Sequence, residues 1–411
     1  MTTTRALFSL FLCLVLLGGA PAWAKLDKKE FGKLKKQLKF AQAKGDTALL
    51  VEALEGLAKD DSDRAVGLVL KVAAVTKVDK AKVYAAAESA LSEMGSAEAT
   101  AELIKFASKR GPSLINILAI NAMAQREDGA TAKALGEALS DKRPEVLRAA
   151  LRAIRLRKAG ECVPGMIDLL EKMEKHPDAL ILGDLRRALI ETTGKWFDVI
   201  EDWRKYWKHE SHEGKRVMTG SAKELLKTAE RGKKPPKFFG TEIRSERIVF
   251  VIDVSGSMEG DRLKKSKEQL TKCINGLDAR SSFTVMCYSS QIRPWNSKLQ
   301  PANPKNKAKA ISFVETLQAN GNTRTRGALV QAFETLGADT IVLLSDGMPT
   351  GTKPNGKDVY SEDEILGEVA GINKTKQWEI HTFGFGQKGG TLADFMEALA
   401  KQNHGKFTRI E

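Results

Sequence analysis

The apolar positions of this chain follow two different periods, and the change from one to the other falls near residue 246. Residues 25 to about 195 place apolar side chains at helical spacing, so that Val146, Ala150 and Ile154 share one helix face. After Arg247, apolar runs of strand length alternate with amphipathic helical segments. The pattern predicts a multidomain protein with an all-α N-terminal part and an α/β C-terminal part.

The helical part contains an internal repeat. Pro112 and Pro144 begin equivalent helices 32 residues apart, and Leu118 then aligns with Ala150. A helix pair of this length cannot bury its own apolar face, so successive pairs must stack into a solenoid. The pattern resembles HEAT-type repeats, and we expect about four to five helix pairs between residues 26 and 193. A plain helical bundle is the alternative.

The helical domain, residues 25–208, ends in an aromatic segment with Trp196, Trp203 and Trp207. We expect this segment to cover the apolar edge of the last repeat, because terminal repeats need a cap. An exposed binding patch is the alternative. The following residues, 209–246, are polar and basic and include Pro235-Pro236, which predicts an extended linker.

Residues 247–411 alternate strands with helices, which predicts a doubly wound, mostly parallel sheet with Rossmann-like layers. Pro294 is typical of a short edge strand. In such a sheet, ligands bind outside the carboxyl ends of the strands. The expected strands are 247–253, 282–289, 340–345, 378–385 and 406–410, and the expected helices are about 261–277, 305–319, 325–336, 361–374 and 391–402.

Three loops at this edge carry oxygen-bearing side chains. The first holds Asp253, Ser255 and Ser257, the second holds Thr323, and the third holds Asp346 directly after an apolar strand. Carboxylates and hydroxyls are hard ligands, which favour a divalent ion such as Mg²⁺, Mn²⁺ or Ca²⁺ over zinc or copper. Two carboxylates and three hydroxyls leave such an ion short of ligands, so water or an outside group would complete its shell.

Residues 247–411 resemble the von Willebrand factor A (VWA) domain with a metal-ion-dependent adhesion site. The resemblance rests on D-x-S-x-S, a threonine in a glycine-rich turn, and S-D-G after a strand, in the family's order. It implies that all five residues hold a divalent metal, Mg²⁺ being favoured, and that an exposed Asp or Glu of a protein partner completes the shell. The chain departs from the family in having Gly321-Asn322 before the threonine, and Thr325 is a competing ligand. A cation-free variant of the fold is the alternative.

Residues beside the predicted metal site would form the rim that contacts a partner. They are Met258, Arg324 and Arg326. The two arginines would make the mouth of the site positive and favour an acidic visitor. They could equally face solvent or pair with acidic groups of the same domain.

The first 24 residues read as a secretory signal peptide. Arg5 precedes an apolar run, and Ala22-Trp23-Ala24 offers a cleavage site after Ala24. We therefore expect an exported protein, periplasmic or secreted, without a transmembrane segment after cleavage. Cys162, Cys273 and Cys287 show no framework spacing, and buried thiols are favoured over a bridge between the last two.

The formal net charge is +14, yet lysines and arginines are spread along the chain and are not interleaved with aromatics. That distribution argues against a nucleic-acid groove. We expect a non-enzymatic adaptor that binds an acidic partner group through a metal, with the helical repeats as a second interaction surface. A charge-driven binder of anionic polymer or envelope lipid is one alternative. A hydrolase is another, but no G-x-S-x-G frames the serines.

Overall fold

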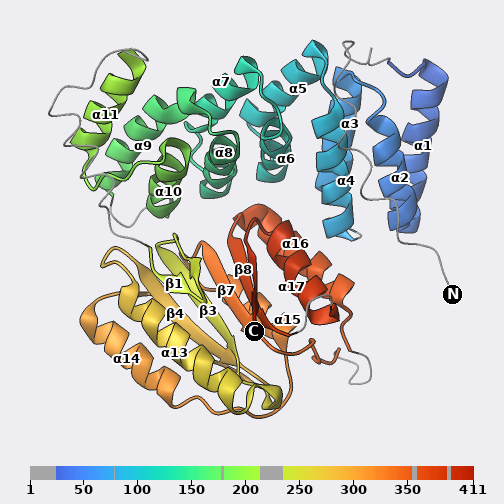
Figure 1. The fold of residues 1–411 in the computed structure, drawn as a ribbon. Coiled ribbons are helices and arrows are strands. Elements are labelled where there is room, and N and C mark those ends of the chain that lie inside the picture. The colour runs from blue at the N-terminus through green and yellow to red at the C-terminus, as the bar shows by residue number, and fades with distance from the viewer. Residues whose placement is uncertain (1–24, 78, 177–179, 213–234, 354–358, 387–389) are drawn as a thin grey trace.

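The computed structural model describes residues 25–77, 79–176, 180–212, 235–353, 359–386 and 390–411, which form a helical domain above an α/β domain in Figure 1. The predicted signal peptide (1–24) and most of the predicted linker lie outside the described residues. Among the described residues, no helix is both long and apolar enough to cross a membrane.

The helical domain is a solenoid, as predicted. In the described residues five helix pairs stack so that α2, α4, α6, α8 and α10 form one row, while α3, α5, α7 and α9 form a second row. Leu118 and Ala150, aligned by the repeat, are both fully buried. The helices are α1 (Lys28–Lys44), α2 (Thr47–Leu57), α3 (Asp63–Val75), α4 (Lys80–Glu93), α5 (Ala97–Ser108), α6 (Ser113–Met123), α7 (Gly129–Ala138), α8 (Pro144–Arg157), α9 (Val163–Glu174) and α10 (Leu182–Thr193).

Local side chains set where these helices begin. The carboxylate of Asp46 and the hydroxyl of Ser96 accept hydrogen bonds from backbone N–H groups in the first turns of α2 and α5. Such caps satisfy donors that have no partner inside the helix. Gly45 ends α1 in the left-handed conformation, which glycine adopts without strain.

An aromatic cluster closes the last repeat, as expected of a cap. Helix α11 (Ile200–His212) packs against α9, and the ring of Trp203 lies 4.9 Å from that of Phe197 and 6.4 Å from that of Tyr206. All three side chains are buried. The helix continues past residue 208, so the predicted domain boundary there is too early.

The C-terminal domain contains the predicted, mostly parallel sheet, in the order β5-β4-β3-β7-β8-β9. Strands β4, β3, β7, β8 and β9 are parallel, and the short β5, which contains Pro294, pairs antiparallel at the edge. The strands are β3 (Arg247–Asp253), β4 (Ser282–Tyr288), β5 (Ile292–Pro294), β6 (Gln300–Pro301), β7 (Thr340–Ser345), β8 (Glu379–Phe385) and β9 (Phe407–Ile410).

Helices cover both faces of this sheet, because its central strands are apolar on both sides. In β3, Phe250 belongs to the core under α13 and α14, whereas Val249 and Val251 belong to the core under α15, α16 and α17. This alternation is the period of two that a strand imposes. The helices are α13 (Asp261–Gly276), α14 (Pro304–Glu315), α15 (Thr325–Phe333), α16 (Glu362–Lys376) and α17 (Thr391–Gln402).

A small hairpin lies within the predicted linker and belongs to the α/β core. It is formed by β1 (Lys237–Phe238) and β2 (Thr241–Glu242). The ring of Phe238 is fully buried, 4.7 Å from the ring of Phe383 and 6.2 Å from that of Phe250. The prediction of a linker up to residue 246 is therefore wrong for 237–246.

The amino ends of the sheet strands face the helical domain. Arg187 of α10 and Arg155 of α8 contact the carboxylate of Glu379, at the start of β8, at 2.9 and 2.8 Å. At the same junction, α4 packs on α16. A Cβ on Gly371 would lie 2.9 Å from the Lys80 side chain, so glycine allows this close approach. The two domains are thus joined by a specific interface.

Replacing Phe238 tests whether the hairpin is structural. Phe238→Ala should lower the free energy of unfolding by about 3–5 kcal/mol, because it removes a buried ring and leaves a cavity. Chemical denaturation of the full chain measures this change. Phe40→Ala, at a ring that is 56% exposed, is the control and should cost far less. Equal, small effects would show that 237–246 is a linker after all.

Candidate functional site

The predicted site lies beside β3, the strand on whose two sides the chain extends the sheet in opposite directions. Strand β3 pairs with β4 on one side and with β7 on the other, and Ile252 is in register with Leu344. Asp253 ends β3 and Asp346 follows β7, so the parallel pairing carries both to the same edge. This is the crevice at which doubly wound sheets bind ligands.

Asp253 is fully buried and held by hydroxyl and amide donors. The backbone N–H of Ser255 donates to its Oδ1 at 2.8 Å, and the hydroxyl of Ser345 donates to its Oδ2 at 2.5 Å. Burial raises the pKa of the Asp253 carboxyl, and these hydrogen bonds oppose the rise. A buried carboxylate that is only partly compensated is suited to meet a cation.

The other predicted ligands converge beside Asp253. Ser255 and Ser257 hydroxyls lie 3.2 Å apart, and the Ser257 hydroxyl donates to Oδ1 of Asp346 at 2.7 Å. The Thr323 hydroxyl and that of Ser257 both approach Gly347, within 3.4 and 3.5 Å of where a Cβ would stand. Because Gly347 has no side chain, the space beside these two hydroxyls stays open.

Thr325, the competing ligand, is directed elsewhere. It is almost fully buried, and its hydroxyl donates to the Tyr288 hydroxyl at 3.5 Å. The Tyr288 hydroxyl in turn lies 3.5 Å from Oδ2 of Asp253. Thr325 therefore acts on the Asp253 carboxylate through the Tyr288 hydroxyl, whereas Thr323 is the threonine that faces the other hydroxyls.

The chain has Gly321-Asn322 where the family usually has two glycines, and the structure shows which of these two positions needs glycine. Gly321 has φ of 72°, and a Cβ there would lie 2.5 Å from the Ser290 hydroxyl oxygen. Asn322 is not among the described residues with positive φ, and its N–H donates to the same Ser290 oxygen at 2.9 Å. The turn needs glycine at 321 and tolerates a side chain at 322.

Arg262 is a site residue that sequence reasoning missed. Its guanidinium donates to Oδ2 of Asp346 at 2.6 Å and to the backbone oxygen of Ser257 at 3.1 Å. The Asp346 side chain is thereby covered, whereas that of Arg262 is 51% exposed. In the sequence, the signal for this role was the position of Arg262 in the first turn of α13, the helix that follows the Asp253 loop.

The rim differs from its prediction. Met258 is fully buried in the core beside α13, so its assignment to the partner-binding rim is wrong. Arg326 makes a two-armed ion pair with Glu368, at 2.6 Å for each arm, and lies over the Tyr360 ring. Arg324 is exposed and donates to the backbone oxygen of Ser290. Among the described residues that border the site, Arg324 and Arg262 are exposed cations.

The donor set fits a hard divalent ion. Carboxylate and hydroxyl oxygens are the ligands such ions prefer, and the site presents two carboxylates and three hydroxyls. In the described part of the chain, no group of three or more His, Cys, Asp or Glu side chains is placed to hold a metal. The three described cysteines are free and buried.

Residues 246–408 match the family model of the von Willebrand factor type A domain. These residues form a VWA domain. Bovine inter-alpha-trypsin inhibitor heavy chain H1 is 29% identical over 178 residues, 40% of this chain, and human heavy chain H4 is 30% identical over 183 residues, 42% of this chain. The match covers 19% of either relative. VWA domains commonly mediate protein–protein binding.

Comparison with solved structures gives two further similarities. A von Willebrand factor type A protein from Catenulispora acidiphila is 23% identical with a TM-score of 0.35, covering 42% of this chain and 40% of that one. The Deinococcus radiodurans RO (RSR) protein is 12% identical with a TM-score of 0.27, covering 87% of this chain and 90% of that one.

The Gly321 turn offers a test of the loop that positions Thr323. Gly321→Ala should lower the free energy of unfolding by more than about 1 kcal/mol, because the new Cβ meets Ser290 at an unfavourable φ. Thermal or urea unfolding measures the loss. The matched control is Gly129→Ala at the start of α7, where a Cβ meets nothing within 4 Å. Equal stability of the two variants would show that the turn does not require glycine at position 321.

Proposed function

We propose that this VWA domain binds one divalent cation, Mg²⁺ being favoured, and through it an acidic group of a protein partner. The observation that carries the proposal is the convergence of five hard oxygen ligands at the open edge of the sheet. They are Asp253, Ser255, Ser257, Thr323 and Asp346. Ser257 is exposed, so a partner can reach this edge.

The charge around the site favours a partner that presents an acidic group. A divalent ion would balance the two carboxylates, and the guanidinium groups of Arg262 and Arg324 would then leave the mouth positive. A partner carboxylate could complete the metal shell and accept a hydrogen bond from an arginine. Charge-assisted hydrogen bonds of this kind are stronger than neutral ones.

The helical domain would supply the second interaction surface. Helices α4, α8 and α10 use part of their surface to contact the VWA domain. We place the second surface on the opposite row, α3, α5, α7 and α9. The role is that of an exported adaptor, periplasmic or secreted, in which the apolar run and Ala22-Trp23-Ala24 of the N-terminus support export.

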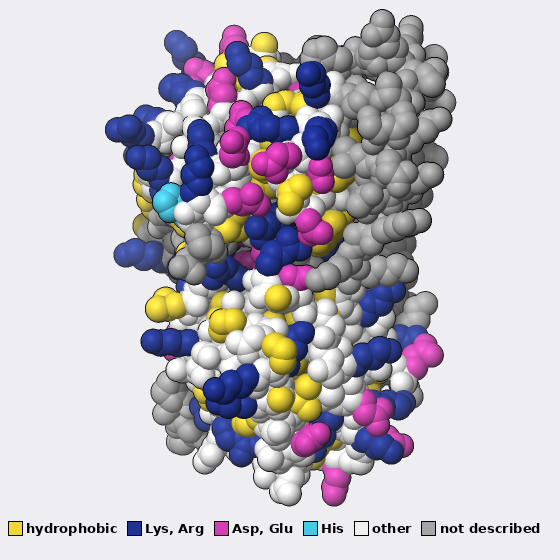
Figure 2. Space-filling view, turned by 90° about the vertical axis from the view of Figure 1, so that its left-hand side faces the viewer, with side chains coloured by type: hydrophobic (Ala, Val, Ile, Leu, Met, Phe, Trp, Pro, Cys, Tyr) yellow, Lys and Arg dark blue, Asp and Glu magenta, His cyan; other side chains and the backbone are white. Residues whose placement is uncertain are grey.

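Two alternatives have less support. For charge-driven binding, the net charge of +14 is the basis, but on the face in Figure 2 basic and acidic side chains are interspersed over the helical domain. For a hydrolase, a serine needs a histidine beside it. His381 instead pairs with Glu379 near the amino ends of the strands, while Ser255 lies at the carboxyl edge.

Removing the buried carboxylate tests metal binding. Mg²⁺ or Mn²⁺ should raise the melting temperature of the full chain, since a ligand at about 100 times its Kd adds about 2.7 kcal/mol to stability. Asp253→Ala should abolish that rise, whereas Asp198→Ala, at a carboxylate whose side chain is 71% exposed, should keep it. An unchanged rise in Asp253→Ala would refute the assigned site.

The same variants test partner binding. Capture of a partner from an envelope extract should be lost with EDTA and with Asp253→Ala. Capture that survives EDTA but disappears at modest salt would support the charge-driven alternative, because screening weakens exposed charge pairs.

Arg262 should weaken metal binding, because its guanidinium competes for the Asp346 carboxylate and repels a cation. Arg262→Gln is therefore expected to tighten Mn²⁺ binding about two- to fivefold, because losing an ion pair with a half-exposed arginine is worth about 0.4–1 kcal/mol. Calorimetric titration of the full chain measures the Kd. Arg409→Gln, which removes an ion pair with Glu411, is the control. Weaker binding in Arg262→Gln would show that the arginine supports the metal instead.

A further inference from the structure

The domain junction buries a cluster of four arginines around a small void. Arg148, Arg152 and Arg155 lie at positions i, i+4 and i+7 of α8, so they share one helix face, and Arg187 comes from α10. Together with Leu151, Asp184, Gln377 and Glu379 they line a void of about 10 Å³. Gln377 and Glu379 belong to the VWA domain, so the void lies between the two domains.

Two buried carboxylates serve three of these arginines. Asp184 accepts from Arg148 at 2.8 Å and from Arg187 at 3.3 Å. Glu379 accepts from Arg155 at 2.8 Å and from Arg187 at 2.9 Å. A third carboxylate, that of Glu191, reaches Arg155 at 3.3 Å from a partly exposed position. A further buried carboxylate, that of Asp339, interacts with Asp184, Arg148 and Arg187. None of these four carboxylates accepts a hydrogen bond from Arg152.

Arg152 has neutral partners within the described residues. Its guanidinium donates to Oδ1 of Asn121 at 2.7 Å and to Oε1 of Gln377 at 2.6 Å. The nearby carboxylate of Glu88 is paired with Lys374. In addition, the buried Nε of Arg187 has no acceptor among the described residues. Among the described residues, Arg152 therefore has no carboxylate as a hydrogen-bond partner, and the Nε of Arg187 has no acceptor.

The neighbouring titratable groups do not supply a full negative charge beside Arg152. Burial and the carboxylate of Asp184 raise the pKa of Asp339 to about 7, so its charge is only partial near neutral pH. Burial and Arg152 hold the pKa of His404 well below its usual value, so this ring is neutral. The ammonium group of Lys376 adds positive charge near Arg148.

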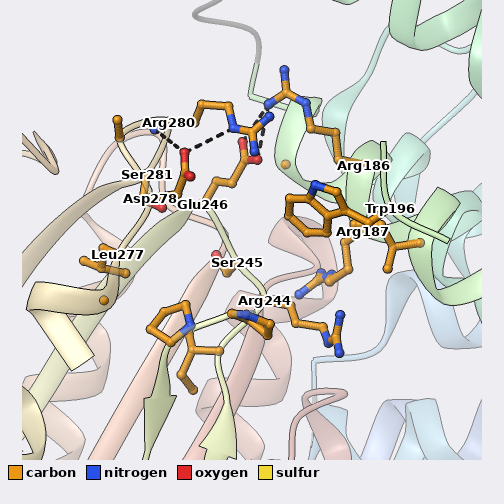
Figure 3. Close-up of a pocket in the computed structure, with 17 residues that line it drawn as sticks. Arg186, Arg187, Trp196, Arg244, Ser245, Glu246, Leu277, Asp278, Arg280 and Ser281 are labelled. Atoms are coloured by element: carbon orange, nitrogen blue, oxygen red, sulfur yellow. Dashed lines mark hydrogen bonds and ion pairs between the residues drawn. The ribbon is translucent and has the colours of Figure 1, made fainter. Parts of the chain in front are cut away.

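We propose that the void binds a small inorganic anion of chloride size. A buried charge without a partner is strongly unfavourable, and a monovalent anion would compensate Arg152 and accept from the Nε of Arg187. The void has room for about one water-sized particle. A larger pocket of about 370 Å³ between the domains, lined by Trp196 and Arg186, also includes Arg187 in its lining (Figure 3).

The anion would act as part of the interface. It lies between α8 and α10 of the helical domain and Gln377 and Glu379 of the VWA domain, so both domains must be docked to form its site. Chloride should therefore stabilise the docked, folded chain. This inference does not rest on the metal site, which lies at the opposite edge of the sheet.

Thermal unfolding of the full chain at constant sodium and ionic strength, with chloride replaced stepwise by gluconate, tests the proposal. Stability should rise with chloride and, above its Kd, a tenfold increase should raise the folded-to-unfolded ratio about tenfold. Arg152→Gln should remove this dependence. Arg204→Gln, at an exposed ion pair with Glu171, should keep it. A wild-type chain insensitive to chloride, or an Arg152→Gln variant as sensitive as the wild type, would overturn the proposal.

Chloride-35 NMR gives a readout that does not depend on stability. The wild-type chain should broaden the chloride line, and excess bromide should reverse the broadening by displacement. Arg152→Gln should broaden the line less than the wild type, whereas Arg204→Gln, which also removes one arginine charge, should broaden it about as much as the wild type. Equal broadening by both variants would mean that the void holds water and that chloride binds only at the surface.

Discussion

The parallel pairing of β3 with β7, and of β7 with β8, is the constraint on which both ends of the VWA domain depend. Parallel strands send all their carboxyl ends to one edge of a sheet, and here that edge collects Asp253 and Asp346. The amino ends collect Asp339 and Glu379, which face the arginines of the helical domain. The proposed cation site and the domain junction therefore lie at opposite edges, and docking leaves the site open.

Much of this arrangement could be predicted from the sequence, because it depends on periodicity. The spacing of Pro112 and Pro144 indicated stacked helix pairs, and the apolar runs indicated the strands within a residue or two. The site followed from the same logic. Once Asp253, Thr323 and Asp346 were each assigned to a strand end or the turn before a helix, the topology brought them together.

The remaining features depend on tertiary contacts that carry no local period. The hairpin strands are two residues long, too short for a pattern, so Phe238 read as part of a linker. Met258 was misjudged because its 3₁₀ turn points it into the core. The burial of Arg148 and Arg152 was not predicted from the sequence. The available signal was a stripe of arginines in α8, whose one acidic residue is Glu145.

Electron paramagnetic resonance of Mn²⁺ titrated into the full chain tests the central claim most directly, because it counts bound ions and reports on their shell. The account predicts one Mn²⁺ per chain and a changed spectrum when a peptide with an exposed glutamate is added, since an open ligand position is filled. Absence of bound Mn²⁺ would contradict the cation site. A bound ion whose spectrum ignores the acidic peptide would contradict its role in binding a partner.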